Sequence, residues 1–161
     1  MLRPITTVLC VLLATSLAAA TAERDSVIRV IEDFFAAMTA RDVDRMRSLM
    51  SEDGMIYGYR ESADGLKVLR QTHAEYLGSL ATGSGKLVER FWEPRLMLHG
   101  RLATVWTPYD FHVDGQFSHC GVNNFSMLRT DTGWIITGVV FSIEVDRCTD
   151  SPLGPLADAP E

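Results

Sequence analysis

The chain has 161 residues, with 15 Lys or Arg against 21 Asp or Glu and a net charge of −6 at pH 7. This acidic balance, without a run of basic residues, argues against nucleic-acid binding, because such binding needs a basic face to neutralise phosphates. Apolar residues make up 47% of the chain, and its length suits one domain with a hydrophobic core.

The N-terminal segment has the pattern of a secretory signal peptide. Arg3 precedes an apolar run from Val8 to Leu17, and small residues follow, so we expect cleavage after Ala20 or Ala22. The run is shorter than the roughly 20 apolar residues of a spanning helix, so no stable membrane anchor is expected after cleavage. Residues 1–22 are thus predicted to be a signal peptide, and the protein to be secreted or periplasmic.

A mature chain of 139 residues would retain 14 basic and 21 acidic side chains and two cysteines, Cys120 and Cys148. An even pair in an oxidising compartment is compatible with one disulfide. For that bridge the chain must fold back after Val145, because the Cα atoms of a disulfide lie within roughly 7 Å. Two separate thiols remain the alternative. Two cysteines without CxxC spacing predict no metal site.

Apolar spacing predicts three helices in the first half. Asp25 or Ser26 is expected to cap the first, whose inward residues are Val27, Ile28, Ile31, Phe34, Phe35 and Met38. Asp42 is expected to cap the second, with Val43, Met46, Leu49 and Met50 inward. A strand at Met55–Tyr59 and a third helix at Leu66–Leu80 complete this half, with His73 on the surface of that helix.

The second half predicts strands at residues 86–98, 101–113, 116–129 and 134–145, separated by His99-Gly100, Asp114-Gly115 and Asp131-Thr132-Gly133. Such short connections predict an antiparallel meander, hence an α+β domain over residues 23–148 with its helices on one face of the sheet. The tail, residues 149–161, is expected to be loosely ordered.

Two registers are possible for the last hairpin. A two-residue loop at Asp131-Thr132 sets His119 opposite Glu144, which would form an acid–base pair, whereas a three-residue loop sets His119 opposite Val145 and separates the two.

Aromatic, acidic and imidazole groups gather in the strands, as expected of a small-molecule pocket with a few polar groups among apolar walls. The candidate catalytic residues are His119, Asp110 and Tyr109; strand alternation places Asp110 on the same face as Trp106 and Tyr109 on the other. The candidate ligand-binding residues are Tyr57, Tyr59, Trp92, Trp106, Phe111, Asn123, Phe125 and Trp134. The tryptophans suit a core or wall better than direct ligand stacking, and His119 suits a structural hydrogen bond between strands better than catalysis. Phosphate-loop and nucleotide motifs are missing, so no cofactor is expected.

Several segments form a pattern known from one superfamily: Phe34-Phe35-Ala36-Ala37-Met38, Ala40-Arg41-Asp42, Ala103-Thr104-Val105-Trp106, Phe117-Ser118-His119-Cys120-Gly121 and Gly133-Trp134-Ile135-Ile136. In these segments the chain resembles the nuclear transport factor 2-like superfamily, in its SnoaL-like or lumazine-binding branch. The resemblance covers about residues 24–148. It implies a cone: a strongly curved, mostly antiparallel sheet packed on three N-terminal helices, with an apolar cavity and often a homodimer through the outer sheet face.

The resemblance also allows the catalytic positions of one activity to be compared. The ketosteroid isomerases of this superfamily use a tyrosine in the first helix and an aspartate after the second. The matching positions here are Phe34 and about Gly58, and neither side chain can donate or accept the proton.

Three functional hypotheses follow. The chain binds a small apolar or aromatic molecule in the cone; or it is an acid–base enzyme of isomerase, dehydratase or cyclase type that uses His119 and Asp110; or it is a dimeric scaffold for another secreted protein. We favour binding without turnover.

Overall fold

The computed structural model describes the backbone of residues 5–156. Arg3 and Pro160, on which parts of the signal-peptide and tail predictions rest, lie outside the described residues. Three helices and seven strands are present in the described range. In chain order the elements are α1 (Ile5–Ala40), α2 (Val43–Leu49), β1 (Met50–Ser62), β2 (Gly65–Thr72), α3 (His73–Thr82), β3 (Leu87–Phe91), β4 (Arg95–His99), β5 (Leu102–Val113), β6 (Gln116–Arg129) and β7 (Trp134–Ser142).

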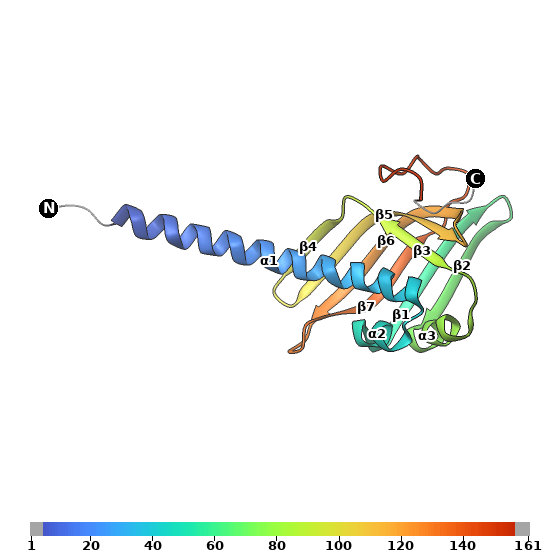
Figure 1. Cartoon of the computed structure of the whole chain (residues 1–161), viewed down its shortest axis with the longest axis horizontal. Helices are drawn as coiled ribbons and strands as arrows, with labels where there is room; N and C mark the ends of the chain where they lie inside the picture. Colours follow the sequence, from blue (N-terminus) through green and yellow to red (C-terminus); the bar gives the residue numbers. More distant parts are fainter. Residues whose placement is uncertain (1–4, 157–161) are drawn as a thin grey trace.

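Helix α1 is a single helix of 36 residues whose N-terminal part extends beyond the sheet (Figure 1). The predicted cap at Asp25 or Ser26 is wrong, because the alanine-rich segment before it favours helix and carries α1 through that point. The Ser26 hydroxyl donates to the Glu23 carbonyl inside the helix (2.6 Å). Among the described residues, no helix is long and apolar enough to cross a membrane.

The short helices are held by side-chain caps. As predicted, Asp42 caps α2, and its carboxylate accepts from the Arg45 N–H (2.9 Å). The predicted helix over Leu66–Leu80 is wrong in its first half, since residues 65–72 form strand β2, which pairs with β1. Helix α3 starts only after Thr72, which forms a capping box with Glu75.

The sheet has the order β2-β1-β7-β6-β5-β3, with β4 also paired to β5. All pairs are antiparallel except β1 with β7, so the predicted meander is confirmed, as is the α+β class with a strongly curved, mostly antiparallel sheet. The predicted strand over residues 86–98 is divided into β3 and β4. At this break Glu93 has a positive φ of 47° and is followed by Pro94.

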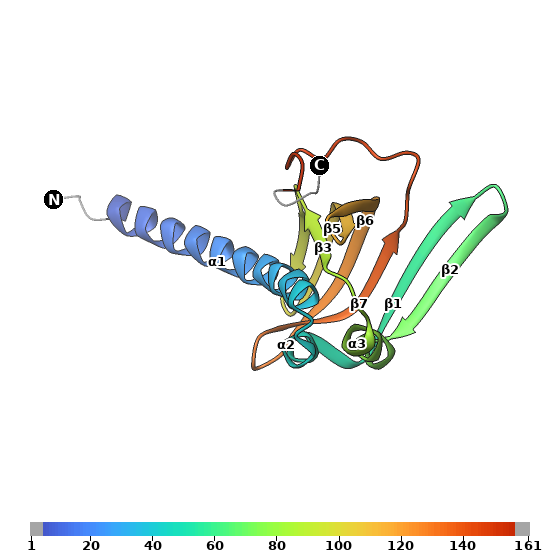
Figure 2. The same ribbon diagram turned by 45° about the vertical axis from the view of Figure 1, so that its right-hand side comes forward.

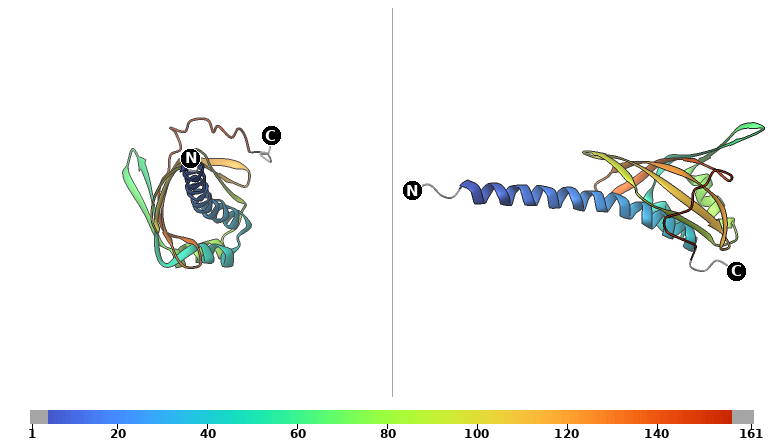
Figure 3. Two further views of the ribbon diagram at one scale, coloured as in Figure 1. Left: turned by 90° about the vertical axis from the view of Figure 1, so that its left-hand side faces the viewer. Right: turned by 90° about the horizontal axis from the view of Figure 1, so that it is seen from above.

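The sheet curves around the C-terminal part of α1, which is seen end-on inside the curve in Figure 3. The hairpin β1–β2 projects away from the other strands (Figure 2). The core lies between the concave face and the helices, where Phe34 and Phe35 of α1 make edge-on ring contacts with Phe125 of β6, both with ring centroids 5.9 Å apart.

Two β-bulges set the faces of the last strands. Next to the turn, Arg129 opposes Trp134, as a two-residue loop requires. Thr137 is then an extra residue in β7, which shifts the pairing by one, so that Glu144 bridges to Cys120 rather than to His119. Each predicted register is therefore right over part of the hairpin, and the proposed His119–Glu144 pair does not form.

The second bulge lies in β6, where Ser118 is the extra residue and Phe111 of β5 consequently opposes His119. Without this residue, His119 would oppose Asp110 and share its face. The bulge instead turns the His119 ring to the concave face, against Phe111 (ring centroids 4.9 Å apart).

Candidate functional site

The concave face encloses a cavity of about 90 Å³ between the helices and strands β3, β5, β6 and β7. Its walls are mostly aromatic and aliphatic, with a few polar side chains among them. The lining residues are Phe34, Phe35, Met38, Ile56, Tyr76, Glu89, Tyr109, His119, Asn123, Phe125, Val139 and Phe141. This is the composition of a small-molecule pocket, although its volume is below the roughly 300–1,000 Å³ of most ligand sites.

Glu89 of β3 is the acidic group of this cavity, and the sequence analysis missed it. Its Oε1 accepts a hydrogen bond of 2.6 Å from Asn123 Nδ2. Burial raises the pKa of Glu89 to about 8, and the negative charge of Asp110 adds to this, whereas the Asn123 hydrogen bond acts in the opposite direction. The carboxyl is therefore mostly protonated at pH 7 and has a proton to donate. Glu89 pairs with Phe111 of β5, and paired residues lie on the same face of a sheet. This pairing therefore identifies Glu89 as a residue of the concave face.

His119 also lines the cavity, as the sequence predicted. Its Nδ1 lies 3.0 Å from the Ser118 hydroxyl. Burial lowers the pKa of His119, and the positive charge of Arg60 lowers it further, so the imidazole is neutral at pH 7. A neutral imidazole in the same cavity as a protonated carboxyl gives one proton acceptor and one proton donor.

Tyr109 is buried in the cavity wall, but its hydroxyl donates to the Ser142 carbonyl (2.7 Å). Burial, with the nearby carboxylates Glu89 and Glu144, raises the pKa of Tyr109. The phenol is therefore held in its neutral form as a structural hydrogen-bond donor.

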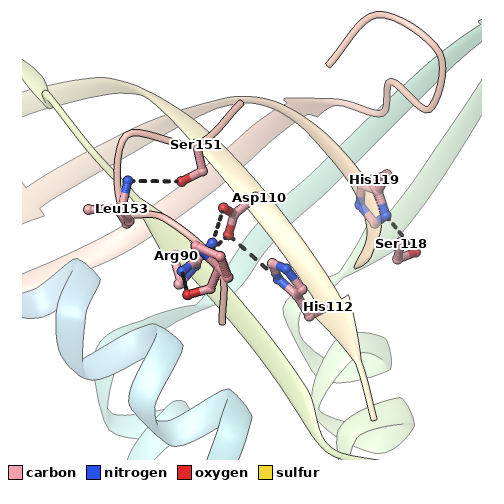
Figure 4. A network of polar contacts seen from close by, with 8 residues as sticks. Arg90, Asp110, His112, Ser118, His119, Ser151 and Leu153 are labelled. Atoms are coloured by element: carbon pink, nitrogen blue, oxygen red, sulfur yellow. Dashed lines mark hydrogen bonds and ion pairs between the residues drawn. The ribbon is translucent and has the colours of Figure 1, made fainter. Parts of the chain in front are cut away.

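Asp110 lies outside the cavity, contrary to the predicted partnership with His119. It shares the outer face of the sheet with Arg90, whose guanidinium donates to it through Nε and Nη2 (2.9 and 2.6 Å). Strand alternation and the Ser118 bulge separate Asp110 from His119, and Figure 4 shows the two groups apart.

The predicted ligand-binding residues divide between the two faces. Asn123 and Phe125 line the cavity, and Phe111 packs beside His119. Tyr57, Tyr59 and Trp106 are exposed, on the outer face. Trp92 lies in the connection after β3, where its carbonyl accepts from Thr107. Trp134 is in the core, and its Nε1 donates to Glu23 (3.1 Å).

At the two positions compared with the ketosteroid isomerases, both residues have a packing role. Phe34 is part of the cavity wall. Gly58 makes room for Phe141, because a Cβ there would lie 2.6 Å from the Phe141 Cζ. Among the described residues, no group of three or more His, Cys, Asp or Glu side chains is arranged to hold a metal ion.

Cys120 and Cys148 form a disulfide, with their Cα atoms 5.8 Å apart. The chain reverses after Glu144, which bridges to Cys120, and this brings Cys148 back to the sheet. The required reversal after Val145 is therefore present.

Residues 27–146 match the SnoaL-like domain. The chain belongs to the SnoaL-like family. The matched residues cover the cone. The match is to the SnoaL-like domain and does not specifically support the lumazine-binding branch. No curated protein matches this SnoaL-like chain.

Solved structures similar to this SnoaL-like chain share its cone. An NTF2-like protein with a cystatin-like fold from Novosphingobium aromaticivorans is 18% identical, with 85% of this chain and 90% of that chain covered and a TM-score of 0.63. An NTF2-like superfamily protein from Salmonella enterica is 14% identical (81% and 96% covered, TM-score 0.63).

A third structure, from Streptomyces avermitilis and described provisionally as a dehydratase of the NTF2-like family, is 18% identical (79% and 99% covered, TM-score 0.61). At these identities the similarity establishes the fold, and the function has to be argued from the site.

Proposed function

We propose that this SnoaL-like protein binds a small apolar or aromatic molecule in the cone cavity. The observation that carries the proposal is the cavity itself, with aromatic walls and the polar group of Glu89 and Asn123 inside it. The apolar walls supply most of the binding free energy, and the protonated Glu89 donates to an acceptor oxygen or nitrogen on the ligand.

The cavity has to enlarge to admit most ligands. Met38 is the wall residue suited to this change, since its unbranched side chain can adopt other rotamers at low cost. The ligand is therefore expected to be compact and flat, with one polar group.

Two neighbouring residues of β7 allow a matched test. Val139 points into the cavity, whereas Val140 is exposed on the outer face. Val139→Phe should fill the cavity and abolish the binding of small aromatic fragments followed by ligand-observed NMR, and Val140→Phe should bind as the unmodified chain does. If both variants bind equally, or if the unmodified chain binds none of a panel of aromatic carbonyls and phenols, the cone is not the ligand site.

Acid–base catalysis is a second candidate function, supported by the raised pKa of Glu89 in the same cavity as the neutral His119. In this hypothesis Glu89 replaces Asp110 as the acidic partner and donates to a substrate oxygen while His119 accepts a carbon-bound proton. It predicts turnover of a bound carbonyl compound with a bell-shaped pH dependence. A rate that is unchanged in both His119→Ala and Glu89→Gln would eliminate it and leave binding alone.

Export with removal of a signal peptide is a further part of the proposal. Glu23 contacts Arg129 and Trp134 on the sheet, so a chain that starts at residue 23 keeps these contacts. Together with the disulfide, this supports cleavage after Ala20 or Ala22. The mass of the protein recovered from its host tests it, and a mass that includes residues 1–20 excludes it.

A further inference from the structure

A second polar cluster lies on the outer face of the sheet, away from the cone. Arg90 of β3 opposes Asp110 of β5 and binds it through two hydrogen bonds. Two residues further along β5, His112 is on the same face, with its Nδ1 3.6 Å from Asp110 Oδ1. Figure 4 shows this cluster beneath the C-terminal segment.

Residues 149–156 pass over the cluster and leave an open pocket of about 590 Å³ between themselves and the sheet. Arg90, Asp110 and His112 line it on the sheet side, and Phe117 adds an aromatic wall. The disulfide holds the start of the segment, and the Pro155 carbonyl lies 3.4 Å from Arg90 Nη1. This volume falls in the range of small-molecule sites without any rearrangement, unlike that of the cone cavity.

The cluster has hydrogen-bonding capacity that the described residues leave unused. Nη1 of Arg90 makes only the long contact to Pro155. His112 is buried, and within residues 5–156 its Nδ1 has no hydrogen-bond partner, a costly arrangement for a buried polar group. Its ring contacts Phe117 edge-on, with centroids 5.7 Å apart.

The charges of the cluster decide which ligand it fits. Arg90 and Asp110 form an ion pair. Burial lowers the pKa of His112, Asp110 raises it by less, and Arg90 lowers it further, so the imidazole is neutral at pH 7. The other charged group of the pocket is the exposed Asp150 of the covering segment. If His112 takes up a proton, the cluster gains one positive charge, which one anionic group can match. A cationic ligand gains little, because Asp110 is already paired and the exposed Asp150 is screened by solvent.

We propose that this pocket is a second ligand site that takes a small aromatic carboxylate, with the carboxylate bound by Arg90 Nη1 and a protonated His112 and the ring placed against Phe117. Guanidinium and imidazolium groups form strong, charge-assisted hydrogen bonds with carboxylates. The site is independent of the cone, and it is covered by the segment that the disulfide tethers.

The proposal predicts that binding is coupled to one proton. A bound carboxylate favours charged His112 and raises its pKa, so the affinity should increase as the pH falls. Between the pKa of His112 in the free protein and its higher pKa in the complex, the dissociation constant should increase about tenfold per pH unit, and outside this range it should level off.

Benzoate is a suitable probe for the full, disulfide-bonded mature chain. We expect its titration, followed by NMR between pH 5.5 and 8, to shift resonances of His112 and Phe117, to raise the pKa of His112 and to show this pH dependence. Neutral benzamide should bind far more weakly. His112→Gln should remove the pH dependence, and His99→Gln, at the exposed β4–β5 turn, should retain it.

Benzoate shifts confined to cone residues such as Phe125, equal binding of benzamide, or a pH-independent affinity would each overturn the proposal. The titration of His112 in the unmodified chain decides the question even if His112→Gln fails to fold.

Discussion

Glu89 is the residue whose environment departs furthest from that of an ordinary carboxyl on a strand. Its pKa of about 8 lies above the roughly 4.3 of a glutamate in an unfolded chain. Between these two values the folded protein holds a proton that the unfolded chain releases. The free energy of unfolding therefore decreases as the pH rises through this window, by at most about 1.4 kcal/mol per pH unit from this group.

Glu89→Gln should remove this pH-dependent decrease in the free energy of unfolding, because glutamine keeps the acceptor for Asn123 but does not ionise. We expect the variant to become more stable relative to the unmodified chain as the pH is raised from 5 to 8, as measured by urea denaturation. Glu52→Gln, at an exposed position of β1, is the control and should follow the unmodified chain. Parallel curves for the Glu89 variant and the unmodified chain would place the pKa of Glu89 near its ordinary value.

At the scale of elements, helix α3 depends on its capping box. The Thr72 hydroxyl accepts from the Glu75 N–H (3.1 Å), and the Glu75 carboxylate accepts from the Thr72 N–H (2.7 Å). Loss of an N-cap side chain costs typically about 1 kcal/mol. Thr72→Ala should therefore lower the free energy of unfolding by about this amount, whereas Thr82→Ala, in the exposed last turn, should cost much less. Equal losses would show that the box contributes nothing.

The start of α3 also shows how far the helices and strands could be predicted from the sequence. Periodicity located the helices around Phe34 and Met46 and the long strands, because these elements bury one regular face. It failed at residues 65–72, where Leu66 and Val68 are exposed and the strand exists only because β1 pairs with it. The pattern of Thr72 followed three residues later by Glu75 marked the true helix start.

The site was harder to predict than the fold, because single extra residues decide which side chains meet. The bulge at Ser118 separates His119 from Asp110, and the bulge at Thr137 separates it from Glu144. A bulge has no strong sequence signal, so strand alternation alone gave the wrong partners. His73 shows the same limit: predicted at the surface, it is buried, with its ring packed against Gly54, where no side chain intervenes.

For the whole molecule, the disulfide closes a long loop that contains the end of β6 and all of β7. Cys120 and Cys148 are 28 residues apart, and a bridge over a loop of this size stabilises a domain by about 3 kcal/mol. Cys148→Ser, Cys120→Ser and the double variant should each lose a similar amount in urea denaturation. A double variant that loses twice as much as either single one would mean that the cysteines act independently.

The outer face of the sheet is the surface that we expect to form the homodimer. One row across β1, β7, β6 and β5 contains Tyr57, Val140, Asn124 and Trp106, and its three apolar members are each more than a third exposed. The guanidinium of Arg95 covers the Trp106 ring only in part, at 5.6 Å from its centroid. Exposed apolar side chains gathered on one face of a sheet are typical of an interaction site. Because this row lies on the opposite face from the cone cavity, two copies can pair through it without closing the cone cavity of either copy.

Val140→Arg would place a charge in the middle of this row. In a two-fold dimer each copy then loses an apolar contact, and the two new charges repel each other. We expect a dimer for the unmodified mature chain and a monomer for this variant in analytical ultracentrifugation. Leu98→Arg, at the exposed end of β4 away from this row, is the control and should remain dimeric. A monomeric unmodified chain, or a Val140→Arg dimer of unchanged affinity, would remove the outer face as the interface. The apolar row would then have to be explained by a partner other than a second copy of the chain, because exposed apolar surface lowers solubility.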